Sequence, residues 1–551
     1  MIERTADLWW KNAVVYCLDP ETFADSDGDG CGDLVGLTDR MDYLAGIGVT
    51  CIWLMPFYPS PNRDDGYDIV DHFGVDGAMG TPGDLVEMVL TAHDRGVRVI
   101  ADLVVNHTSD QHEWFQRSRA NRDSPYRDFY VWADEPPPDA KDIKPVFPDA
   151  EDSVWTYDEE AGQYYLHHFY RHQPDLNVAN ATVRDAIAKI MGFWLQQGLC
   201  GFRIDAVPFL IETHGIAASE EKGRDPHDLL REMRGFASRR KGDQVLLGEV
   251  NLPPDQLEAY FGGERGDQLQ MLFAFTVNQA MYLAFARGEA APIAEALRAL
   301  PPLPDACQWA HFVRNHDELT LDKLSEDERR EVFAAFGPHP GMQLFGRGLR
   351  RRLPTMLEGD ADRIHLAYSL LFSLPGTPVL FYGEEIGMAE NLAIPGRMSV
   401  RAPMQWSGSE PNGGFSTADP SALRRPVVDD PGYGPEAVNV ADQRRDPHSL
   451  LNWMERVIRT RKECPEIGWG TWRILEADEP AVLAIAHEWN GRTLVALHNL
   501  GEAEVTATVD AEGLDVEALG EVLGRGEHRA RPRGGLEVRL GRYGYRWLRS
   551  A

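Results

Sequence analysis

Short apolar segments alternate with longer segments of helical periodicity along most of this sequence, and this alternation restricts the fold more than any other feature. A run of β-branched and aromatic residues followed by an amphipathic helix is the repeating unit of a parallel sheet. The eight apolar runs predicted as strands are residues 13–18, 49–54, 97–105, 199–205, 245–250, 271–275, 309–315 and 377–383. This pattern predicts an α/β fold, a (β/α)8 TIM barrel.

Helix boundaries between these strands carry the expected signals. The segment 81–96 begins with Thr81 and Pro82, which suit the cap and first-turn positions, and it ends before a glycine. The segment 183–197 has apolar residues at three-to-four spacing and stops at Gly198. Both segments are predicted to be helices that pack on the barrel.

Two regions do not fit the repeating unit. About 75 residues separate the third strand from its helix, and a structureless loop of that length is improbable, so we expect an inserted subdomain over the barrel's C-terminal face. Beyond the amphipathic segment 450–463, apolar and polar residues alternate around a turn at Asn490-Gly491, which predicts antiparallel β structure. The expected divisions are 1–106 and 183–465 for the catalytic barrel, 107–182 for the inserted lid subdomain and 466–551 for a C-terminal β-sandwich domain.

Charge and cysteine usage narrow the classes of function. A net charge of −32 without a basic run argues against a nucleic-acid partner. The six cysteines are scattered without metal-like spacing, which is typical of a reduced, cytoplasmic protein. The first residues lack the pattern of a signal peptide, and no stretch reaches the roughly 18 apolar residues of a membrane span. We expect a cytoplasmic protein with no membrane partner. The sequence does not decide whether the protein forms a homo-oligomer.

Polar residues follow several predicted strands at the point where each strand ends. The active sites of such barrels are built there. Asp205, Glu249 and Asp317 bring three carboxylates to this rim. Cleavage of a glycosidic bond with retention needs two carboxyl groups roughly 5–5.5 Å apart, one ionised nucleophile and one protonated acid. Asp317 would hold sugar hydroxyls and developing positive charge, and His107 and His316 would add hydrogen bonds to the same ring.

Local environment separates the roles of the first two carboxylates. Arg203 lies two residues before Asp205, on the same side of an extended strand, and a nearby cation lowers the pKa of a carboxyl group. We therefore predict that Asp205 is the nucleophile. Glu249 follows the apolar run VLLG, and apolar surroundings raise a carboxyl pKa toward the range of a general acid.

These residues belong to segments that resemble a known family. DLVVNH (102–107), GFRIDA (201–206), GEV (248–250) and VRNHDE (313–318) are similar to the four signature regions of the α-amylase superfamily, glycoside hydrolase family 13, and QPDLN (173–177) resembles the fifth signature of its oligo-1,6-glucosidase and trehalose synthase group. The resemblance implies that Asp205 is the nucleophile, Glu249 the acid/base and Asp317 the transition-state stabiliser. This agrees with the interpretation from the residues alone.

Two further segments bear on the size of the substrate. DDGYDI (64–69) resembles the family loop that places an aromatic ring and a carboxylate at the first sugar, here Tyr67 and Asp68. RAPMQW (401–406) resembles the segment after the eighth strand whose arginine, here Arg401, pairs with that carboxylate. Such a pair would close the pocket around the terminal sugar. We therefore expect small α-glucosides as substrates rather than the interior of a polymer.

The stretch DSDGDGCGD carries acids at alternate positions around glycines. Asp25, Asp27, Asp29 and Asp33 offer oxygen ligands at a spacing that suits Ca²⁺. The resemblance implies a metal loop at this place, with the backbone carbonyl of Cys31 as a further ligand. We expect a structural Ca²⁺, with Mg²⁺ as an alternative occupant, and no organic cofactor.

The longer phrases WFQRSR, YVWADE and RNHDELTL most resemble trehalose synthases, which interconvert maltose and trehalose. The resemblance implies a glucosyl intermediate on Asp205 and a closed pocket that excludes water. Phe169 is the candidate for the lid over the second sugar, with core packing as its alternative. The segment after Glu249 departs from trehalose synthases, so an exo-acting α-glucosidase and an intermolecular α-glucosyltransferase stay open. A catalytically inactive sugar-binding protein is disfavoured because the catalytic set is complete.

Overall fold

The computed structural model describes residues 8–138, 140–211, 225–531 and 534–550. Eight parallel strands close into a barrel in the order β1-β2-β3-β7-β8-β9-β10-β14. Their bounds are β1 (Val15–Leu18), β2 (Cys51–Leu54), β3 (Arg98–Leu103), β7 (Gly201–Ile204), β8 (Val245–Gly248), β9 (Met271–Phe273), β10 (Gln308–Phe312) and β14 (Thr377–Phe381). Each strand lies within one of the predicted apolar runs or begins one residue before it. The predicted TIM barrel is confirmed.

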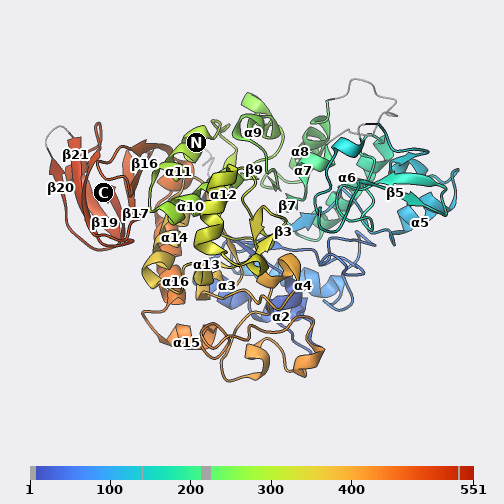
Figure 1. Ribbon diagram of the computed structural model, residues 1–551, viewed down its shortest axis with the longest axis horizontal. Helices are drawn as coiled ribbons and strands as arrows, with labels where there is room; N and C mark the ends of the chain where they lie inside the picture. Colours follow the sequence, from blue (N-terminus) through green and yellow to red (C-terminus); the bar gives the residue numbers. More distant parts are fainter. Residues whose placement is uncertain (1–7, 139, 212–224, 532–533, 551) are drawn as a thin grey trace.

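Helices surround the barrel (Figure 1). The main helices are α2 (Leu34–Asp39), α3 (Met41–Ile47), α4 (Pro82–Asp94), α6 (Ala181–Gln196), α8 (Asp228–Arg240), α9 (Pro254–Phe261), α10 (Phe275–Arg287), α11 (Ala291–Ala299), α12 (Glu326–Phe336), α14 (Ala361–Ser373), α15 (Val440–Arg445) and α16 (Leu450–Glu463). The cap predicted at Thr81 is present, because its side chain accepts from the backbone of Asp84 and the Asp84 carboxylate accepts in return.

One glycine is required by the barrel itself. Gly201 opens β7 with a φ of 148°, and a β-carbon there would lie 2.0 Å from the carbonyl oxygen of Val245 in the neighbouring strand β8. Only glycine fits so close an approach. Arg203 follows on the same strand and Asp205 comes directly after it, so this close contact lies at the start of the strand that carries them to the rim.

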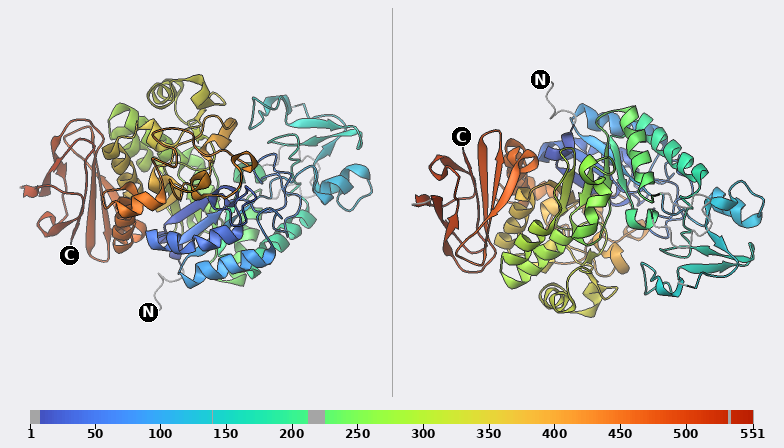
Figure 2. Two further views of the ribbon diagram at one scale, coloured as in Figure 1. Left: turned by 90° about the horizontal axis from the view of Figure 1, so that it is seen from below. Right: turned by 90° about the horizontal axis from the view of Figure 1, so that it is seen from above.

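An inserted subdomain follows β3. Its small antiparallel sheet has the order β4-β6-β5, with β4 (Trp132–Ala133), β5 (Trp155–Asp158) and β6 (Gln163–Leu166), and α5 (Glu113–Ala120) lies before it. An antiparallel bridge between His107 and Asp175 ties the end of the insertion back to the segment that follows β3. The insertion lies at one end of the molecule and the C-terminal sheets at the other (Figures 1 and 2).

The C-terminal region forms a sandwich of two antiparallel sheets. The first sheet contains β15 (Thr471–Leu475), β16 (Val482–Trp489), β17 (Arg492–Asn499), β22 (Tyr545–Ser550) and β19 (Leu519–Leu523), and the second contains β18 (Val505–Asp510), β21 (Gly535–Leu540) and β20 (His528–Arg531). In β16, Leu483 and Ile485 pack with the barrel core, whereas Val482 and Ala484 pack between the sheets. The two-residue alternation thus buries both faces.

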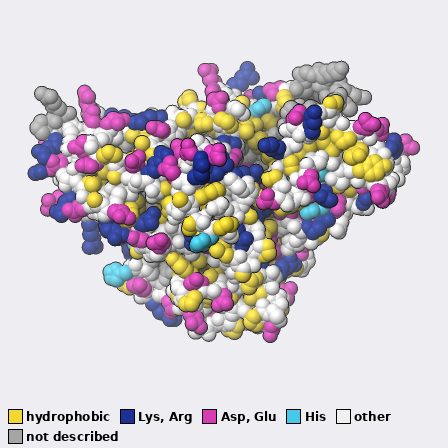
Figure 3. All heavy atoms as spheres, viewed as in Figure 1, with side chains coloured by type: hydrophobic (Ala, Val, Ile, Leu, Met, Phe, Trp, Pro, Cys, Tyr) yellow, Lys and Arg dark blue, Asp and Glu magenta, His cyan; other side chains and the backbone are white. Residues whose placement is uncertain are grey.

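The surface agrees with the composition. On the face shown in Figure 3, Lys and Arg side chains are interspersed with Asp and Glu, and no field of positive charge covers it. All six cysteines are buried and carry free thiols, as predicted. Within the described part of the chain, no helix combines the length and apolar character needed to cross a bilayer.

Candidate active site

A cavity of about 420 Å³ opens where the barrel strands end. Asp205 and Glu249 directly follow β7 and β8, and Asp317 lies in the loop after β10. All three side chains line the cavity. The carboxylates predicted from the strand ends are therefore brought together in one pocket, while their catalytic roles stay predictions.

Arg203 is the shared partner of this group. Its Nη1 donates to Asp205 and to Asp102, and its Nη2 lies 2.8 Å from Oε2 of Glu249. The arginine is 1% exposed, so these charge-assisted bonds lie in a low-dielectric setting. Asp205 and Glu249 are held side by side on one guanidinium group, as two carboxyl groups acting on one glycosidic bond must be.

Burial dominates the acidity of both carboxyl groups. It raises the pKa of Asp205 to about 6, although the charge of Arg203 opposes this shift. It also raises the pKa of Glu249, to about 7. The prediction that Arg203 leaves Asp205 with a lowered pKa is wrong, because desolvation outweighs the ion pair. The predicted order holds, since Glu249 keeps its proton to a higher pH than Asp205.

Asp317 lies among donors. His316 Nε2 is 3.0 Å from its carboxylate, and Arg397 and Arg401 donate to it at 2.7 and 3.0 Å. Burial opposes ionisation, but His316 and the two arginine charges outweigh it and hold the pKa of Asp317 well below its ordinary value. Burial lowers the pKa of His316 to about 4, so that ring is neutral near pH 7. An ionised Asp317 suits the stabilisation of positive charge on a sugar ring.

Tyr67 occupies the wall beside these groups. Its hydroxyl is 2.8 Å from His316 Nε2 and donates to Asp102 at 3.2 Å, and its ring stacks on the imidazole with centroids 5.7 Å apart. Tyr67 lines the cavity. The ring therefore lies in the cavity wall with its hydroxyl held by hydrogen bonds, and its contact with the first sugar stays a prediction.

The predicted ion pair between Asp68 and Arg401 is not formed. Asp68 is fully buried and accepts from Arg63 and Ser60 outside the cavity. The Asp–Arg pair that reaches the cavity joins Asp64 to Arg397. An aspartate and an arginine thus pair in the cavity wall, but the prediction of which residues form the pair is wrong. That the pair closes the pocket stays a prediction.

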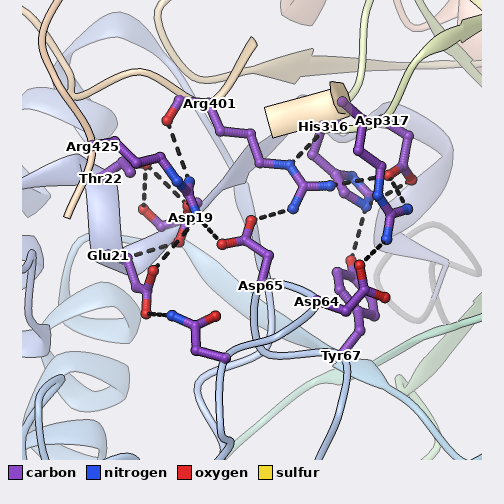
Figure 4. Close-up of polar contacts among 12 residues, drawn as sticks. Asp19, Glu21, Thr22, Asp64, Asp65, Tyr67, His316, Asp317, Arg401 and Arg425 are labelled. Carbon is purple, nitrogen blue, oxygen red and sulfur yellow. Dashed lines mark hydrogen bonds and ion pairs between the residues drawn. The ribbon is translucent and has the colours of Figure 1, made fainter. Parts of the chain in front are cut away.

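The shape of the loop explains this difference. Asp65 and Gly66 both have positive φ, 54° and 86°, and this left-handed turn reverses the chain between Asp64 and Tyr67. The turn directs Asp64 toward the cavity and leaves Asp65 to pair with Arg401 behind it (Figure 4). The sequence resemblance assigns the paired carboxylate to Asp68, which precedes no such turn, whereas the turn at Asp65 and Gly66 decides which aspartate reaches the cavity.

Aromatic side chains of the insertion cover the mouth of the cavity. Phe169 is partly exposed and lines the cavity, with its ring 5.0 Å from His107 and 5.4 Å from Phe209 by centroids. Phe147 lies 5.9 Å from Phe169 and also lines the cavity. The exposure of Phe169 favours the lid over core packing. Phe147 and Phe209 had no sequence signal beyond being aromatic.

His107 is positioned by the backbone rather than free to turn. Its Nε2 is 3.2 Å from the carbonyl oxygen of Tyr67, and Asn106 contacts its Nδ1 at 3.3 Å. Burial lowers its pKa, which favours the neutral ring. It lines the cavity, as predicted.

The residue after Asp205 has an uncommon backbone conformation. Ala206 adopts φ 50° and ψ 40° in the left-handed region, and its N–H donates to Oε2 of Glu249 at 3.1 Å. A non-glycine residue in this region is strained and persists only where the surroundings fix it. The turn therefore links the backbone after Asp205 directly to the carboxyl group of Glu249.

The acidic loop after β1 brings together part of the predicted metal set. Ligand oxygens of Asp25, Asp27 and Asp29 lie within 4.8 Å of one another. Asp33 is not part of this group, because its carboxylate accepts from Ser26 and caps α2 through the backbone of Gly36. Three converging carboxylates are a donor set that Ca²⁺ prefers. The role of the Cys31 carbonyl stays a prediction.

Comparison with known proteins gives consistent matches. The family description "Alpha amylase, catalytic domain" matches residues 17–334 and 349–470, and "Sucrose hydrolase-like, C-terminal domain" matches residues 491–549. The trehalose synthase of Pimelobacter sp. (strain R48) is 41% identical over 527 residues, which cover 94% of this chain and 91% of that protein. The trehalose synthase/amylase TreS of Mycolicibacterium smegmatis is 45% identical over 484 residues, or 87% and 80% of the two chains. The crystal structure of an α-amylase from H. orenii superposes with a TM-score of 0.78 at 27% identity, covering 98% of this chain and 100% of that one.

Proposed function

This chain belongs to the α-amylase family, glycoside hydrolase family 13, and is an enzyme of that family, and from this premise we propose that it interconverts maltose and trehalose by moving a glucosyl group within one bound disaccharide. The observation that carries the proposal is the cavity. It holds three carboxylates beside a closed end formed by Asp64 and Arg397, under an aromatic lid. This shape admits the terminal sugar of a small α-glucoside.

The chemistry follows the retaining pathway. Glu249 donates its proton to the glycosidic oxygen while a carboxylate oxygen of Asp205 bonds to C1 of the terminal glucose, and the bond from C1 to the second sugar breaks. The released glucose then turns, and its anomeric hydroxyl attacks C1. Glu249 takes the proton of that hydroxyl, and the bond to Asp205 breaks. No water is consumed, and Asp317 stabilises the positive charge in both steps.

The outcome depends on keeping water from the glucosyl intermediate. Phe147, Phe169 and Phe209 pack over the cavity from two parts of the chain and retain the released sugar. The similarity to the trehalose synthase of Pimelobacter sp., at 41% identity over 94% of the chain, supports isomerisation.

Product analysis in labelled water tests this proposal. Purified protein given maltose in H₂¹⁸O should form mainly trehalose without ¹⁸O, because C1 never meets water. Glucose carrying ¹⁸O as nearly the sole product would identify an α-glucosidase. A second reaction with added ¹³C-glucose distinguishes transfer within one disaccharide from transfer between molecules. Labelled trehalose or longer oligosaccharides would identify transfer between molecules.

We also propose that the acidic loop holds a structural Ca²⁺. Asp25 already accepts from the backbone N–H groups of Gly28 and Gly30 at 2.7 and 2.8 Å, which fixes its carboxylate. Asp27 and Asp29 are exposed and present theirs from the same turn. A bound cation would neutralise three neighbouring negative charges and stabilise the loop between β1 and α2.

A further inference from the structure

A buried chain of ion pairs leads from Asp317 away from the cavity (Figure 4). Arg401 donates to Asp317 at 3.0 Å through Nη2 and to Asp65 through Nη1. The other oxygen of Asp65 pairs with Arg425, whose Nη1 also donates to Asp19 at 3.0 Å. Three segments distant in the sequence therefore meet at a single carboxylate.

The backbone of Asp65 is fixed by an Asp-Gly turn that the N–H of Tyr67 closes on the carbonyl oxygen of Asp64 at 3.0 Å. This turn does not pair the carboxylate of Asp65. Its side chain is 3% exposed, so its charge must be paired inside the protein. Arg401 and Arg425 supply that pairing, one on each oxygen, and removal of either would leave an oxygen of Asp65 without its cation.

Arg401 transmits this placement to the active site. Its Nε donates to the carbonyl oxygen of His316 at 2.7 Å, and its Nη2 donates to the neighbouring Asp317. The guanidinium is fully buried and its three nitrogens each have an acceptor. A rotation of Asp65 would draw Nη1 with it and tilt the planar group, because the guanidinium moves as one rigid unit.

Arg425 contacts Asp65 and is not among the residues that line the cavity. Besides Asp65 and Asp19, Arg425 contacts the carbonyl oxygen of Arg401 at 3.3 Å through Nη1 and Glu21 at 3.6 Å through Nη2. We propose that Arg425 is a positioning residue of the active site, which holds Asp65 and thereby fixes Arg401 and the carboxylate of Asp317. The proposal rests on the role assigned above to Asp317 in glucosyl transfer.

The chain offers a matched control one residue away. Arg424 pairs with Glu21 on the outer side of the same segment and is more exposed than Arg425, with side-chain exposures of 34% and 11%. Its described ion pair does not include Asp65. Arg424 and Arg425 share Glu21, so R424Q removes the same charge and the same number of atoms at the edge of the network and leaves both cations of Asp65 in place.

Steady-state hydrolysis or transfer with 4-nitrophenyl α-glucoside separates positioning from folding. R425Q should lower kcat roughly 10- to 100-fold with KM changed less than about threefold, because a misplaced Asp317 weakens the transition state more than the bound substrate. R424Q should keep kcat within about twofold. R425K should recover part of the loss, since an ammonium group can still reach one oxygen of Asp65. Equal losses of kcat in R424Q and R425Q would overturn the proposal.

A double-mutant cycle tests the route. If Arg425 acts through Asp65, then D65N and R425Q should each lower kcat, and the double variant should be no worse than the poorer single variant. D65N combined with R424Q should show multiplied effects. Multiplied losses for D65N with R425Q would show that the two act independently and would contradict the proposal.

A crystal structure of R425Q gives an outcome that does not depend on any activity. We expect Arg401 Nη2 to lie beyond hydrogen-bond distance of Asp317 in that variant, with Asp65 rotated. An unchanged contact between Arg401 and Asp317 would overturn the positioning role even if the proposed reaction were correct. Failure of the wild-type protein to release 4-nitrophenol would instead count against the proposed function.

Discussion

Arg397 and Asp64 form an ion pair in the wall of the cavity, contributed by the segment after β14 and by the loop after β2. Arg397 also donates to Asp317 at 2.7 Å, so one arginine joins Asp64 to a carboxylate that we propose for catalysis. The ring of Phe147 lies over the same guanidinium at 4.9 Å from its centroid. Arg397 therefore contacts three parts of the site. These are Asp64, which we expect to bind the terminal sugar, the carboxylate of Asp317, and Phe147 of the lid.

Replacement of Asp64 should weaken the recognition of the terminal sugar. In D64N, a buried charged acceptor for Arg397 and for the sugar hydroxyls is lost, and such hydrogen bonds are worth about 1.5–3 kcal/mol. We expect kcat/KM for maltose to fall roughly 10- to 150-fold. D68N is the contrast, because Asp68 does not line the cavity and accepts from Arg63, Ser60 and the backbone N–H of Asp64. Asparagine keeps an acceptor oxygen for that N–H, so D68N should lower the unfolding temperature and raise KM much less than D64N does. A larger effect of D68N on KM would restore the assignment from the sequence.

The acidities of Asp205 and Glu249 predict a narrow pH profile. Asp205 must be ionised to attack and has a pKa of about 6, so kcat/KM should rise with pH through that value. Glu249 must be protonated to donate and has a pKa of about 7, so kcat/KM should fall above it. Initial rates on 4-nitrophenyl α-glucoside across pH 4.5 to 9 would give the two macroscopic values of the coupled pair. In E249Q the rate should fall about 10²- to 10⁴-fold, and the fall of kcat/KM at high pH should disappear. If E249Q kept that fall at the same pH, ionisation of Glu249 could not be its cause.

The same raised pKa has a consequence for stability. Glu249 has an ordinary pKa of 4.5 and a folded pKa of about 7, so the folded state binds the proton more tightly than the unfolded state. Its ionisation therefore costs stability progressively as pH rises from about 4.5 to about 7. E249Q removes this cost, and we expect it to be more stable than the wild type by about 1–3 kcal/mol at pH 8. Denaturant unfolding at pH 8 and pH 4 checks this, because the gain should vanish at the lower pH.

The sequence was sufficient for the features that follow directly from strand ends. Asp205 and Glu249 come immediately after apolar runs, so the position of each on the barrel was determined once the run was recognised. The pair of Asp64 and Arg397 could not be found in this way, because 333 residues separate them and a left-handed turn decides which aspartate faces the cavity. Likewise the sign of the pKa shift of Asp205 depends on its burial, which local sequence does not encode.

Calcium should stabilise the folded protein through the acidic loop. A ligand that binds only the folded state adds about 2.7 kcal/mol at one hundred times its Kd, so the unfolding temperature should rise with added Ca²⁺ and fall with a chelator. D27N should reduce this response, because Asp27 supplies one of the three converging carboxylates. D39N alters an exposed acid outside the loop and should respond like the wild type. An equal response of both variants to Ca²⁺ would place the binding elsewhere, and parallel titrations with Mg²⁺ would identify the preferred ion.

Phe169 should control the fate of the glucosyl intermediate. F169A removes the ring that contacts His107 and Phe209 at the cavity mouth, which opens a path for water and for escape of the released glucose. We expect maltose consumption to persist while the ratio of ¹⁸O-labelled glucose to trehalose rises several-fold in H₂¹⁸O. F73A is the control, since Phe73 is an exposed ring that packs on Phe193 and does not line the cavity. If F169A and F73A gave the same product ratio, the lid would have to be assigned to Phe147 or to another part of the insertion.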